Sequence, residues 1–361
     1  MNTLALIATR KGLFKLTHEK QIEEVAFIGD PVSMILAHPD KPLWYAALDL
    51  GHFGVKLHRS EDSGATWTEV STPSYPQVNR DEKQEGDSLK LIWSLEFADP
   101  NDLMKLWAGT VPGGLFYSDD SGQSWTLNKT LWQQKQTSEW FGGGFDEPGI
   151  HSICVDPRNH HEVKVAISCG GVWVTEDFGA NWRAGAQGMR AEYMPPDKTF
   201  DINIQDPHRM VQCAHDPDKF WTQHHNGIFY SDDNCQSWHE CKNVSPSGFG
   251  FAVAVHPNNA NKAWFVPGVK DESRIPVNAK FIVNYTEDRG KTFSALDNGL
   301  PTEKCYDLVF RHGLDIDHNG EKLLLGSTTG NLWLSEDQGQ NWQCISNHLP
   351  PIYAVRFLRC S

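Results

Sequence analysis

The stretch SEDSGATW, residues 60–67, places two carboxylates and several hydroxyl groups beside a tryptophan, a combination that could perform acid–base chemistry. Related stretches begin at residues 118, 175, 231, 286 and 335, and their final aromatic residues are 58, 57, 56, 55 and 49 positions apart. A period of this length is typical of a solenoid, a propeller or an array. Since six copies of one reaction centre are not expected in one chain, the repeat predicts a structural turn.

Each residue type of this acid–glycine turn has a structural task. The aspartate can accept hydrogen bonds from N–H groups of its own turn, and the glycine can adopt a positive φ. The tryptophan supplies a large apolar surface for packing between neighbouring sheets. Two copies depart from the pattern, because Cys235 replaces the glycine and Phe293 replaces the tryptophan. A cysteine in the left-handed region would be strained by about 1–2 kcal/mol.

The residues around each turn predict four short strands per unit. In residues 91–127, a turn cluster with a proline, a Pro-Gly-Gly turn and the acid–glycine turn separate the runs LIWSLEF, KLWAGT, LFYS and SWTL. Sequences like the third run occur seven times, from GLFKL near residue 12 to NLWLS near residue 331. Four strands joined by tight turns form an antiparallel meander.

The two ends of the chain each supply part of a unit. Residues 352–357 read as a first strand, and the N-terminal TLALIATRKGLFKL reads as second and third strands. Joined, they complete a seventh sheet and close a ring. The sequence therefore predicts an all-β fold with a single domain, residues 1–361. This domain is a seven-bladed β-propeller of four-stranded antiparallel blades, in which the C-terminal strand joins the N-terminal blade.

The same topology predicts where a site would lie. The acid–glycine turn joins the third and fourth strands, so the second-to-third turns and the links between blades emerge on the opposite face. The links 71–90, 128–149 and 183–207 and the turn 267–280 exceed ordinary loop length, which favours function. Their side chains, sent from separate blades to one face, are expected to line one pocket. The candidate catalytic residues are His151, His224, His225, Asp271, Glu272, Arg274 and Tyr306. The candidate substrate-binding residues are His52, Trp93, Trp140, Tyr193, His208 and Gln223.

Composition limits the partners and the compartment. The formal net charge of −14 and the pI near 5.5 argue against binding to nucleic acid or to an anionic membrane surface, since both need a basic footprint. No stretch approaches the roughly 20 apolar residues that span a bilayer. The eight cysteines form no CxxC pair, and the N-terminus shows no charged leader or cleavage pattern. The sequence predicts a soluble cytoplasmic protein with reduced thiols.

The SxDxGxxW pattern resembles the Asp-box, or BNR, repeat of sialidase-like propellers, and the chain is similar to bacterial BNR-repeat proteins labelled glycosyl hydrolases. The resemblance implies the propeller fold and a carbohydrate-active enzyme, although one fold hosts many functions. Sialidases carry an Arg-Ile-Pro motif in an early blade, whereas Arg274-Ile275-Pro276 lies in a late turn. The sialidase arginine role is therefore not assigned to Arg274, and true sialidase activity is not expected.

Two classes of function fit these features. The first is a carbohydrate-active enzyme of the hydrolase or lyase type. A hydrolase needs a pair of carboxyl groups, for which the candidates are Asp146, Glu147, Asp271 and Glu272. A lyase needs a base and a cation that stabilises an enolate, for which the candidates are His151, His224, His225 or Tyr306 with Arg274. The second class is a non-catalytic propeller that binds a ligand or a protein partner on the same face.

The expected ligand of the enzyme is a small molecule or an oligosaccharide. A deep pocket with paired acids or converging histidines would favour an enzyme, whereas a broad flat apolar patch would favour a partner surface. The sequence requires no cofactor. A divalent metal is conceivable, and its ligands would be His52, His151, His208 and one of His224 and His225.

Overall fold

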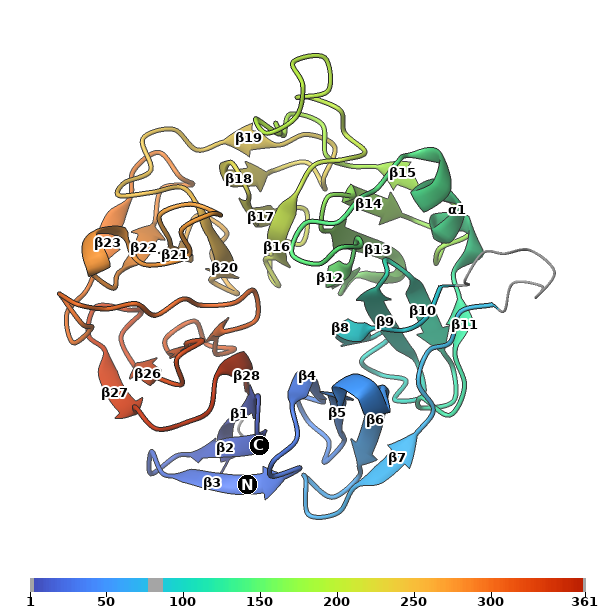
Figure 1. The fold of residues 1–361 in the computed structure, drawn as a ribbon, viewed down its shortest axis with the longest axis horizontal. Coiled ribbons are helices and arrows are strands. Elements are labelled where there is room, and N and C mark those ends of the chain that lie inside the picture. Colours follow the sequence, from blue (N-terminus) through green and yellow to red (C-terminus); the bar gives the residue numbers. More distant parts are fainter. Residues whose placement is uncertain (1–2, 77–86, 360–361) are drawn as a thin grey trace.

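The computed structural model describes residues 3–76 and 87–359, which form seven four-stranded antiparallel sheets arranged in a ring (Figure 1). The predicted seven-bladed β-propeller is confirmed. In the blade that closes the ring, the strands in spatial order are β28 (Ile352–Phe357), β1 (Thr3–Thr9), β2 (Gly12–Thr17) and β3 (Ile22–Ala26). Ile7 pairs with Val355, so the C-terminal strand is the inner strand of the N-terminal blade, as predicted.

The other six blades follow the chain from the inner strand outward. The second blade contains β4 (Val32–Ala37), β5 (Trp44–Asp49), β6 (Val55–Ser60) and β7 (Thr68–Val70). The third contains β8 (Leu91–Phe97), β9 (Leu106–Val111), β10 (Leu115–Ser118) and β11 (Thr126–Leu127). The fourth contains β12 (Ile150–Asp156), β13 (Asn159–Ile167), β14 (Gly171–Thr175) and β15 (Arg183–Ala184).

The remaining three blades have the same order. The fifth contains β16 (Pro207–Gln212), β17 (Phe220–His224), β18 (Gly227–Ser231) and β19 (His239–Glu240). The sixth contains β20 (Gly250–Val255), β21 (Ala263–Pro267), β22 (Val283–Thr286) and β23 (Ser294–Leu296). The seventh contains β24 (Leu314–Ile316), β25 (Leu323–Gly326), β26 (Leu332–Ser335) and β27 (Gln343–Ser346).

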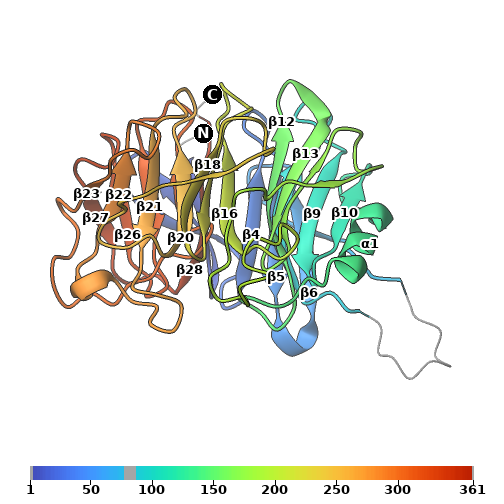
Figure 2. The ribbon, with the colours of Figure 1, turned by 90° about the horizontal axis from the view of Figure 1, so that it is seen from above.

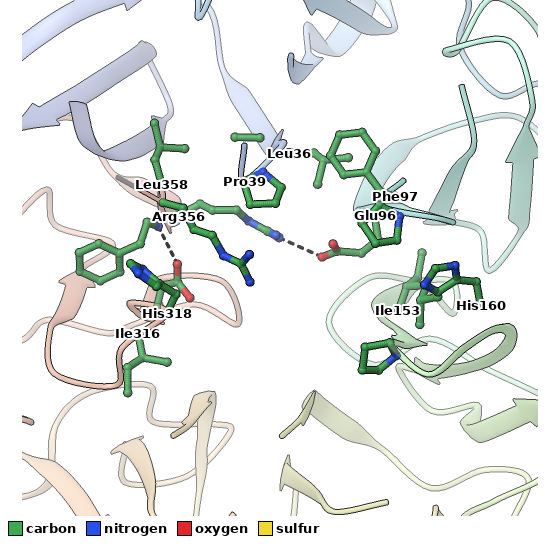
Figure 3. A pocket seen from close by; sticks show the side chains of 17 residues that line it. Leu36, Pro39, Glu96, Phe97, Ile153, His160, Ile316, His318, Arg356 and Leu358 are labelled. Carbon is green, nitrogen blue, oxygen red and sulfur yellow. Dashed lines mark hydrogen bonds and ion pairs between the residues drawn. The ribbon is translucent and has the colours of Figure 1, made fainter. Parts of the chain in front are cut away.

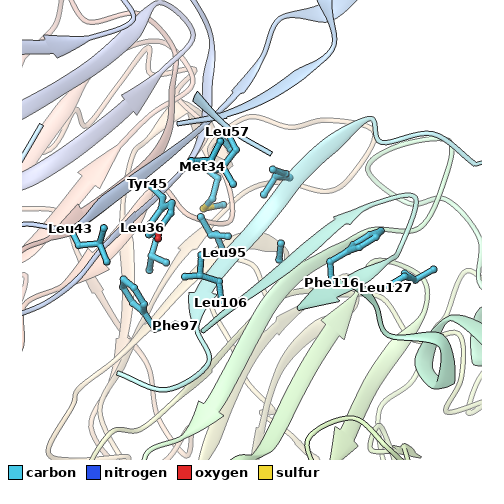
Figure 4. Packing of buried hydrophobic residues seen from close by; sticks show 14 of the residues in the cluster. Met34, Leu36, Leu43, Tyr45, Leu57, Leu95, Phe97, Leu106, Phe116 and Leu127 are labelled. Atoms are coloured by element: carbon cyan, nitrogen blue, oxygen red, sulfur yellow. The ribbon is translucent and has the colours of Figure 1, made fainter. Parts of the chain in front are cut away.

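The core lies between neighbouring blades. Leu36, Tyr45 and Leu57 of the second blade belong to one buried cluster with Leu95 and Phe97 of the third (Figure 4). The middle strand β9 is buried along its whole length because both faces of its sheet are covered. Such strands read as continuous apolar runs rather than alternating ones. The blades thereby support one another around the ring and hold the loops at both ends of the central channel.

The acid–glycine turns have the geometry expected of a structural turn. Asp62 accepts the N–H of Thr66 at 2.8 Å with Oδ1 and the Thr66 hydroxyl at 2.6 Å with Oδ2. The hydroxyl of Ser60 donates to Asp62 and accepts the N–H of Gly64, each at 2.8 Å. Gly64 has a φ of 86°, and Cys235, at the equivalent position, has a φ of 59°. The cysteine thus occupies the left-handed region.

The aromatic residue of the turn secures the seam between blades. Trp238 donates from its indole N–H to the carbonyl of Gly185 at 2.7 Å, and Trp125 donates to the carbonyl of Ser71 at 2.9 Å. Both acceptors follow the outer strand of the preceding blade. In these two turns the tryptophan joins successive blades, whereas Trp67 donates to the carbonyl of Gly64 in its own turn at 3.1 Å.

The two faces of the ring differ in what they carry. We call the face with the acid–glycine turns the repeat face, and the face with the second-to-third turns and the links between blades the link face. In Figure 2 the 3₁₀ helices η1 (Gly51–Phe53, blue) and η2 (Val277–Ala279, orange) lie at the lower edge, on the link face. The C-terminal end lies at the upper edge, on the repeat face.

One link contains a helix that the sequence analysis did not predict. α1 (Lys129–Thr137) lies on the outer rim after the third blade, and the Asn128 side chain caps it by accepting the N–H of Leu131 at 2.9 Å. Residues 77–86 of the first long link lie outside the described residues. None of the helices in the described part of the chain has the length and apolar character needed to cross a membrane.

Candidate functional site

Two adjoining cavities open on the link face and share Gly144, Phe251, Arg274 and Arg311. The first, of about 270 Å³, lies between residues 141–144 and the loops of the fifth and sixth blades. The second, of about 300 Å³, extends past Trp93 toward the axis of the ring. We call the two together the link-face pocket. Links and turns from separate blades thus meet in one place.

A buried carboxylate forms the floor of this pocket. Asp206 is 3% exposed, and its Oδ1 accepts the N–H of Cys169 at 3.1 Å and the hydroxyl of Ser168 at 3.3 Å. Its Oδ2 lies 3.3 Å from Nε2 of His208 and 3.4 Å from Nδ1 of His225. Burial alone would raise the pKa of this carboxyl, but the two histidines and a nearby arginine hold it well below its ordinary value.

The two histidines beside the carboxylate differ in environment. His208 is buried, its ring stacks on Phe251 with centroids 4.6 Å apart, and its Nδ1 lies 2.6 Å from the carbonyl oxygen of Gly250. Burial lowers the pKa of His208 in spite of the neighbouring carboxylate. His225 is half-buried, and its ring lies 4.9 Å from that of Tyr193. Burial opposes the charged form of His225, but the hydrogen bond to Asp206 and the negative charges of Asp206, Asp271 and Glu272 together raise its pKa.

Arg311 is a buried cation without a hydrogen-bonded counterion. It is 7% exposed, and among the described residues no acceptor reaches its Nε or Nη2. The guanidinium carbon lies 4.6 Å from the ring centroid of Trp93 and 5.2 Å from that of Phe251. Burial lowers the pKa of Arg311 to about 10, so the group is still charged at neutral pH. A buried charged group whose donors lack acceptors is costly, and few native side chains are left in this condition.

Two carboxylates and a second arginine lie on the rim. Arg274 donates to Oδ1 of Asp271 from Nε at 3.0 Å and from Nη2 at 2.6 Å. Glu272 lies 3.4 Å from the ammonium group of Lys270. All of these residues belong to the turn between β21 and β22, which is the expanded turn noted in the sequence. The rim thus adds charged groups of both signs to the pocket.

The predicted site residues fall into three groups. Those that line the pocket are Trp93, Tyr193, His208, His225, Asp271, Glu272 and Arg274. Those that are buried outside it are Trp140, His151, Gln223 and His224. Those that lie elsewhere on the exposed surface are His52 and Tyr306, and the alternative carboxyl candidates Asp146 and Glu147 also do not line the pocket.

The buried histidines have structural partners. His151 lies with Nε2 at 2.7 Å from the carbonyl oxygen of Pro207 and Nδ1 at 3.0 Å from the hydroxyl of Ser152. The two ring nitrogens of His224 each lie 3.1 Å from a backbone nitrogen. Nε2 lies beside the backbone nitrogen of Asp206, just before β16, and Nδ1 lies beside that of Asn226, in the turn between β17 and β18. Burial holds the pKa of His151 well below its ordinary value and lowers that of His224 to about 3.

The other two buried candidates also support loops. Gln223 donates from Nε2 to the carbonyl of Gly248 at 2.7 Å, which ties the fifth blade to the link that follows it. Trp140 packs on Trp173 with ring centroids 5.5 Å apart and so anchors the link before the fourth blade. These contacts place the two side chains below the surface, away from the pocket.

Two prominent pocket residues were not among the predicted site residues. Asp206 lies near the end of the link 183–207, and its position two residues before His208 predicts that both side chains point to one side of an extended chain. Arg311 was not noted. Its aromatic neighbours come from the third and sixth blades, so no local pattern marks it.

A larger cavity of about 390 Å³ lies at the other end of the channel, on the repeat face (Figure 3). Its two central carboxylates already have partners, because Glu96 accepts from Arg356 at 3.0 Å and Asp315 accepts the N–H of Phe357 at 2.7 Å. Burial raises the pKa of Asp315 to about 6. Much of the wall is apolar, including Leu36 and Ile153. We therefore take the link-face pocket as the candidate site.

Comparison with known proteins relates the chain to glycoside hydrolases. No family model matches it. It is 29% identical over 305 residues to the oligoxyloglucan-reducing end-specific xyloglucanase of Emericella nidulans, which covers 78% of this chain and 35% of that protein. The chain thus spans about a third of the length of this curated relative.

Solved structures with the same architecture include enzymes and a binding protein. A GH74 xyloglucanase from Xanthomonas campestris superposes with a TM-score of 0.66 at 16% identity, over 96% of this chain and 53% of that one. YCF48 bound to a D1 peptide superposes with a TM-score of 0.56 at 13% identity, over 95% of this chain and 84% of that one. At these identities the likeness shows the fold alone.

Proposed function

We propose that this protein is a carbohydrate-active enzyme that binds an acidic oligosaccharide in the link-face pocket. The observation that carries the proposal is Arg311, whose buried guanidinium has no hydrogen-bond acceptor for Nε and Nη2 among the described residues. A carboxylate on a sugar ring would supply the missing acceptors, since arginine and carboxylate form strong charge-assisted hydrogen bonds. The sequence relationship to a xyloglucanase supports an oligosaccharide as the ligand.

The walls of the pocket suit a sugar. Trp93 and Phe145 line it with aromatic surface, their rings meeting edge to face with centroids 5.0 Å apart. Apolar sugar faces pack on such rings, while polar groups around them fix orientation. Arg274 and Arg311 both line the two cavities, so the pocket contains two cations although the net charge of the protein is −14. Because Arg274 is paired with Asp271, Arg311 is the cation that remains available to an acidic ligand.

Hydrolysis of a glycosidic bond is the first candidate reaction. It needs two carboxyl groups that flank the bond, and Asp271 and Glu272 reach the pocket from the rim. The relationship to the xyloglucanase favours this reaction.

β-Elimination is the second candidate, and Arg311 favours it. In that reaction a cation beside the sugar carboxylate stabilises the enolate formed when a base removes the neighbouring proton. In addition, a hydrogen bond from its own backbone N–H and the neighbouring Lys270 lower the pKa of Glu272, which disfavours this carboxyl as the proton donor of a hydrolase.

The test is a product analysis with acidic and neutral substrates. The purified protein is incubated with uronic-acid oligosaccharides and with neutral xyloglucan oligosaccharides, and products are measured by mass and by ultraviolet absorbance. Saturated products with one added water identify a hydrolase, and unsaturated uronic-acid ends identify a lyase. Equal turnover of neutral and acidic substrates would contradict the role given to Arg311. No turnover of either class, together with retention of a protein partner, would favour the binding propeller instead.

A further inference from the structure

The carboxylate and the two histidines on the pocket floor have the arrangement of a metal-binding triad. Oδ2 of Asp206 lies 3.3 Å from Nε2 of His208 and 3.4 Å from Nδ1 of His225, and all three atoms lie within 4.8 Å of one another. Two ligand atoms that each lie about 2.1 Å from one ion at tetrahedral angles are about 3.4 Å apart. The observed separations therefore leave space for one ion between the three side chains.

The protonation of His208 gives a second, independent reason. Its Nδ1 lies 2.6 Å from the carbonyl oxygen of Gly250, which can only accept, so Nδ1 carries a hydrogen. In a neutral ring Nε2 then holds a lone pair, and this lone pair points at Oδ2 of Asp206. Two acceptors that face each other need a cation or a second proton between them.

The surroundings resemble those of metal ligands in proteins. A histidine that binds a metal donates its other ring N–H to a carbonyl or a carboxylate, as His208 does to Gly250. Oδ1 of Asp206 is fixed by the N–H of Cys169 and the hydroxyl of Ser168, which leaves Oδ2 directed at the two imidazoles. The three side chains also line the pocket, so an ion among them would have coordination positions open to a ligand or to water.

We propose that Asp206, His208 and His225 bind one divalent transition-metal ion at the floor of the link-face pocket. Two imidazoles and one carboxylate suit zinc, manganese or ferrous iron. The set differs from the one considered from the sequence, because His52 lies on the exposed surface and His151 is occupied by Pro207 and Ser152. The proposal does not depend on the reaction or on the sugar, since an ion can be measured without a substrate.

The experiment measures metal stoichiometry. The protein is purified without chelators and analysed by elemental mass spectrometry, then stripped with a chelator and titrated separately with Zn²⁺ and Mn²⁺ by calorimetry. We expect about one ion per chain and saturable binding at a single site. Asp206→Asn and His225→Ala should each lower the affinity at least about 10-fold. His52→Ala, which removes an exposed histidine on the same face, is the matched control and should leave the stoichiometry unchanged.

Folding is checked by melting each variant, and His225→Ala carries the test if the more buried Asp206→Asn does not fold, because His225 is half-buried. Metal binding that persists unchanged in His225→Ala would overturn the proposal. A protein that takes up neither ion would also overturn it, and hydrogen on both ring nitrogens of His208 by ¹⁵N NMR would then identify an imidazolium–carboxylate pair in the same geometry.

Discussion

The repeat face and the link face both carry aspartates, but the hydrogen-bond partners of these aspartates differ between the two faces. On the repeat face Asp337 has both oxygens occupied: Oδ1 by the Ser335 hydroxyl and the Asn341 N–H, each at 2.8 Å, and Oδ2 by the Asn341 amide at 2.6 Å. On the link face one oxygen of Asp206 faces two histidines, and no acceptor from residues 3–76 or 87–359 reaches two of the Arg311 nitrogens. Asp337 is thus satisfied within its own turn, whereas the link-face groups keep donors and acceptors that the proposed ligands would use.

The difference lies in the distance along the chain between partners. The donors to Asp337 lie two and four residues away, so each turn forms its bonds as soon as it closes. Cys169, which donates to Asp206, lies 37 residues away in another blade. Hydrogen bonds within one turn stabilise the fold. Groups brought together from separate blades can instead keep donors or acceptors that a ligand can use. The variants below test this contrast.

The largest effect is expected from Arg311→Met. Hydrogen bonds to charged groups contribute about 1.5–3 kcal/mol, so affinity for an acidic oligosaccharide should fall about 10- to 150-fold by calorimetry. The melting temperature should stay the same or rise, because a buried cation without acceptors has been removed. Arg10→Met, at an exposed arginine on the same face, is the control. A melting temperature that falls steeply with affinity intact would assign Arg311 to the fold.

The opposite pattern is expected from Asp337→Ala on the repeat face. Loss of the bonds from Ser335 and Asn341 should lower the free energy of unfolding by about 1–2 kcal/mol, measured by urea denaturation, with ligand and metal binding unchanged. Gln340→Ala changes an exposed residue of the same turn and should have little effect. If Asp337→Ala weakened ligand or metal binding but left the free energy of unfolding unchanged, the assignment of stability to the repeat face and of binding to the link face would be refuted.

Lowering the pH should decrease the stability that the aspartates of the repeat face contribute, over a defined pH range. Hydrogen bonds from Thr66 and Asn181 lower the pKa values of Asp62 and Asp177 to about 2. The folded-state pKa lies below the unfolded value near 4, so the stabilisation is present above pH 4 and is lost as the pH falls toward 2. The urea midpoint should decrease over this interval. Thr66→Val, which removes the hydroxyl donor to Asp62, should make the decrease shallower, and an unchanged slope would contradict this account.

The smallest effect is expected at the turn in which Cys235 replaces the glycine. Cys235 has a φ of 59°, so Cys235→Gly should relieve about 1 kcal/mol of backbone strain and raise the melting temperature slightly. The reverse change, Gly122→Cys, is a matched control, because the φ there is 84° and the nearest atom to an added Cβ is 3.5 Å away. It should lower the melting temperature by a similar amount. No change, or a loss, in Cys235→Gly would show that packing of the buried thiol outweighs the strain.

Much of the candidate site could be predicted, but not its most informative parts. Sequence topology placed Trp93, His208, His225 and Arg274 on the link face, where they line the pocket, because strand order fixes which loops share an edge. It could not separate His225, which lines the pocket, from its neighbour His224, which supports the loops. Adjacent residues in a tight turn differ only in the direction of their side chains, and that direction depends on packing.

The sequence by itself determined the blade count, the strand order, the closure of the ring and the structural task of SEDSGATW, because these features rest on local periodicity and on bonds within a few residues. Only the tertiary structure decided which polar groups are satisfied and which are not. Within the described residues, Nε and Nη2 of Arg311 lack acceptors and Asp206 lies beside two imidazoles, because separate blades bring their loops together around the link-face pocket. These contacts between blades depend on the curvature of the whole ring, which no short stretch of sequence encodes.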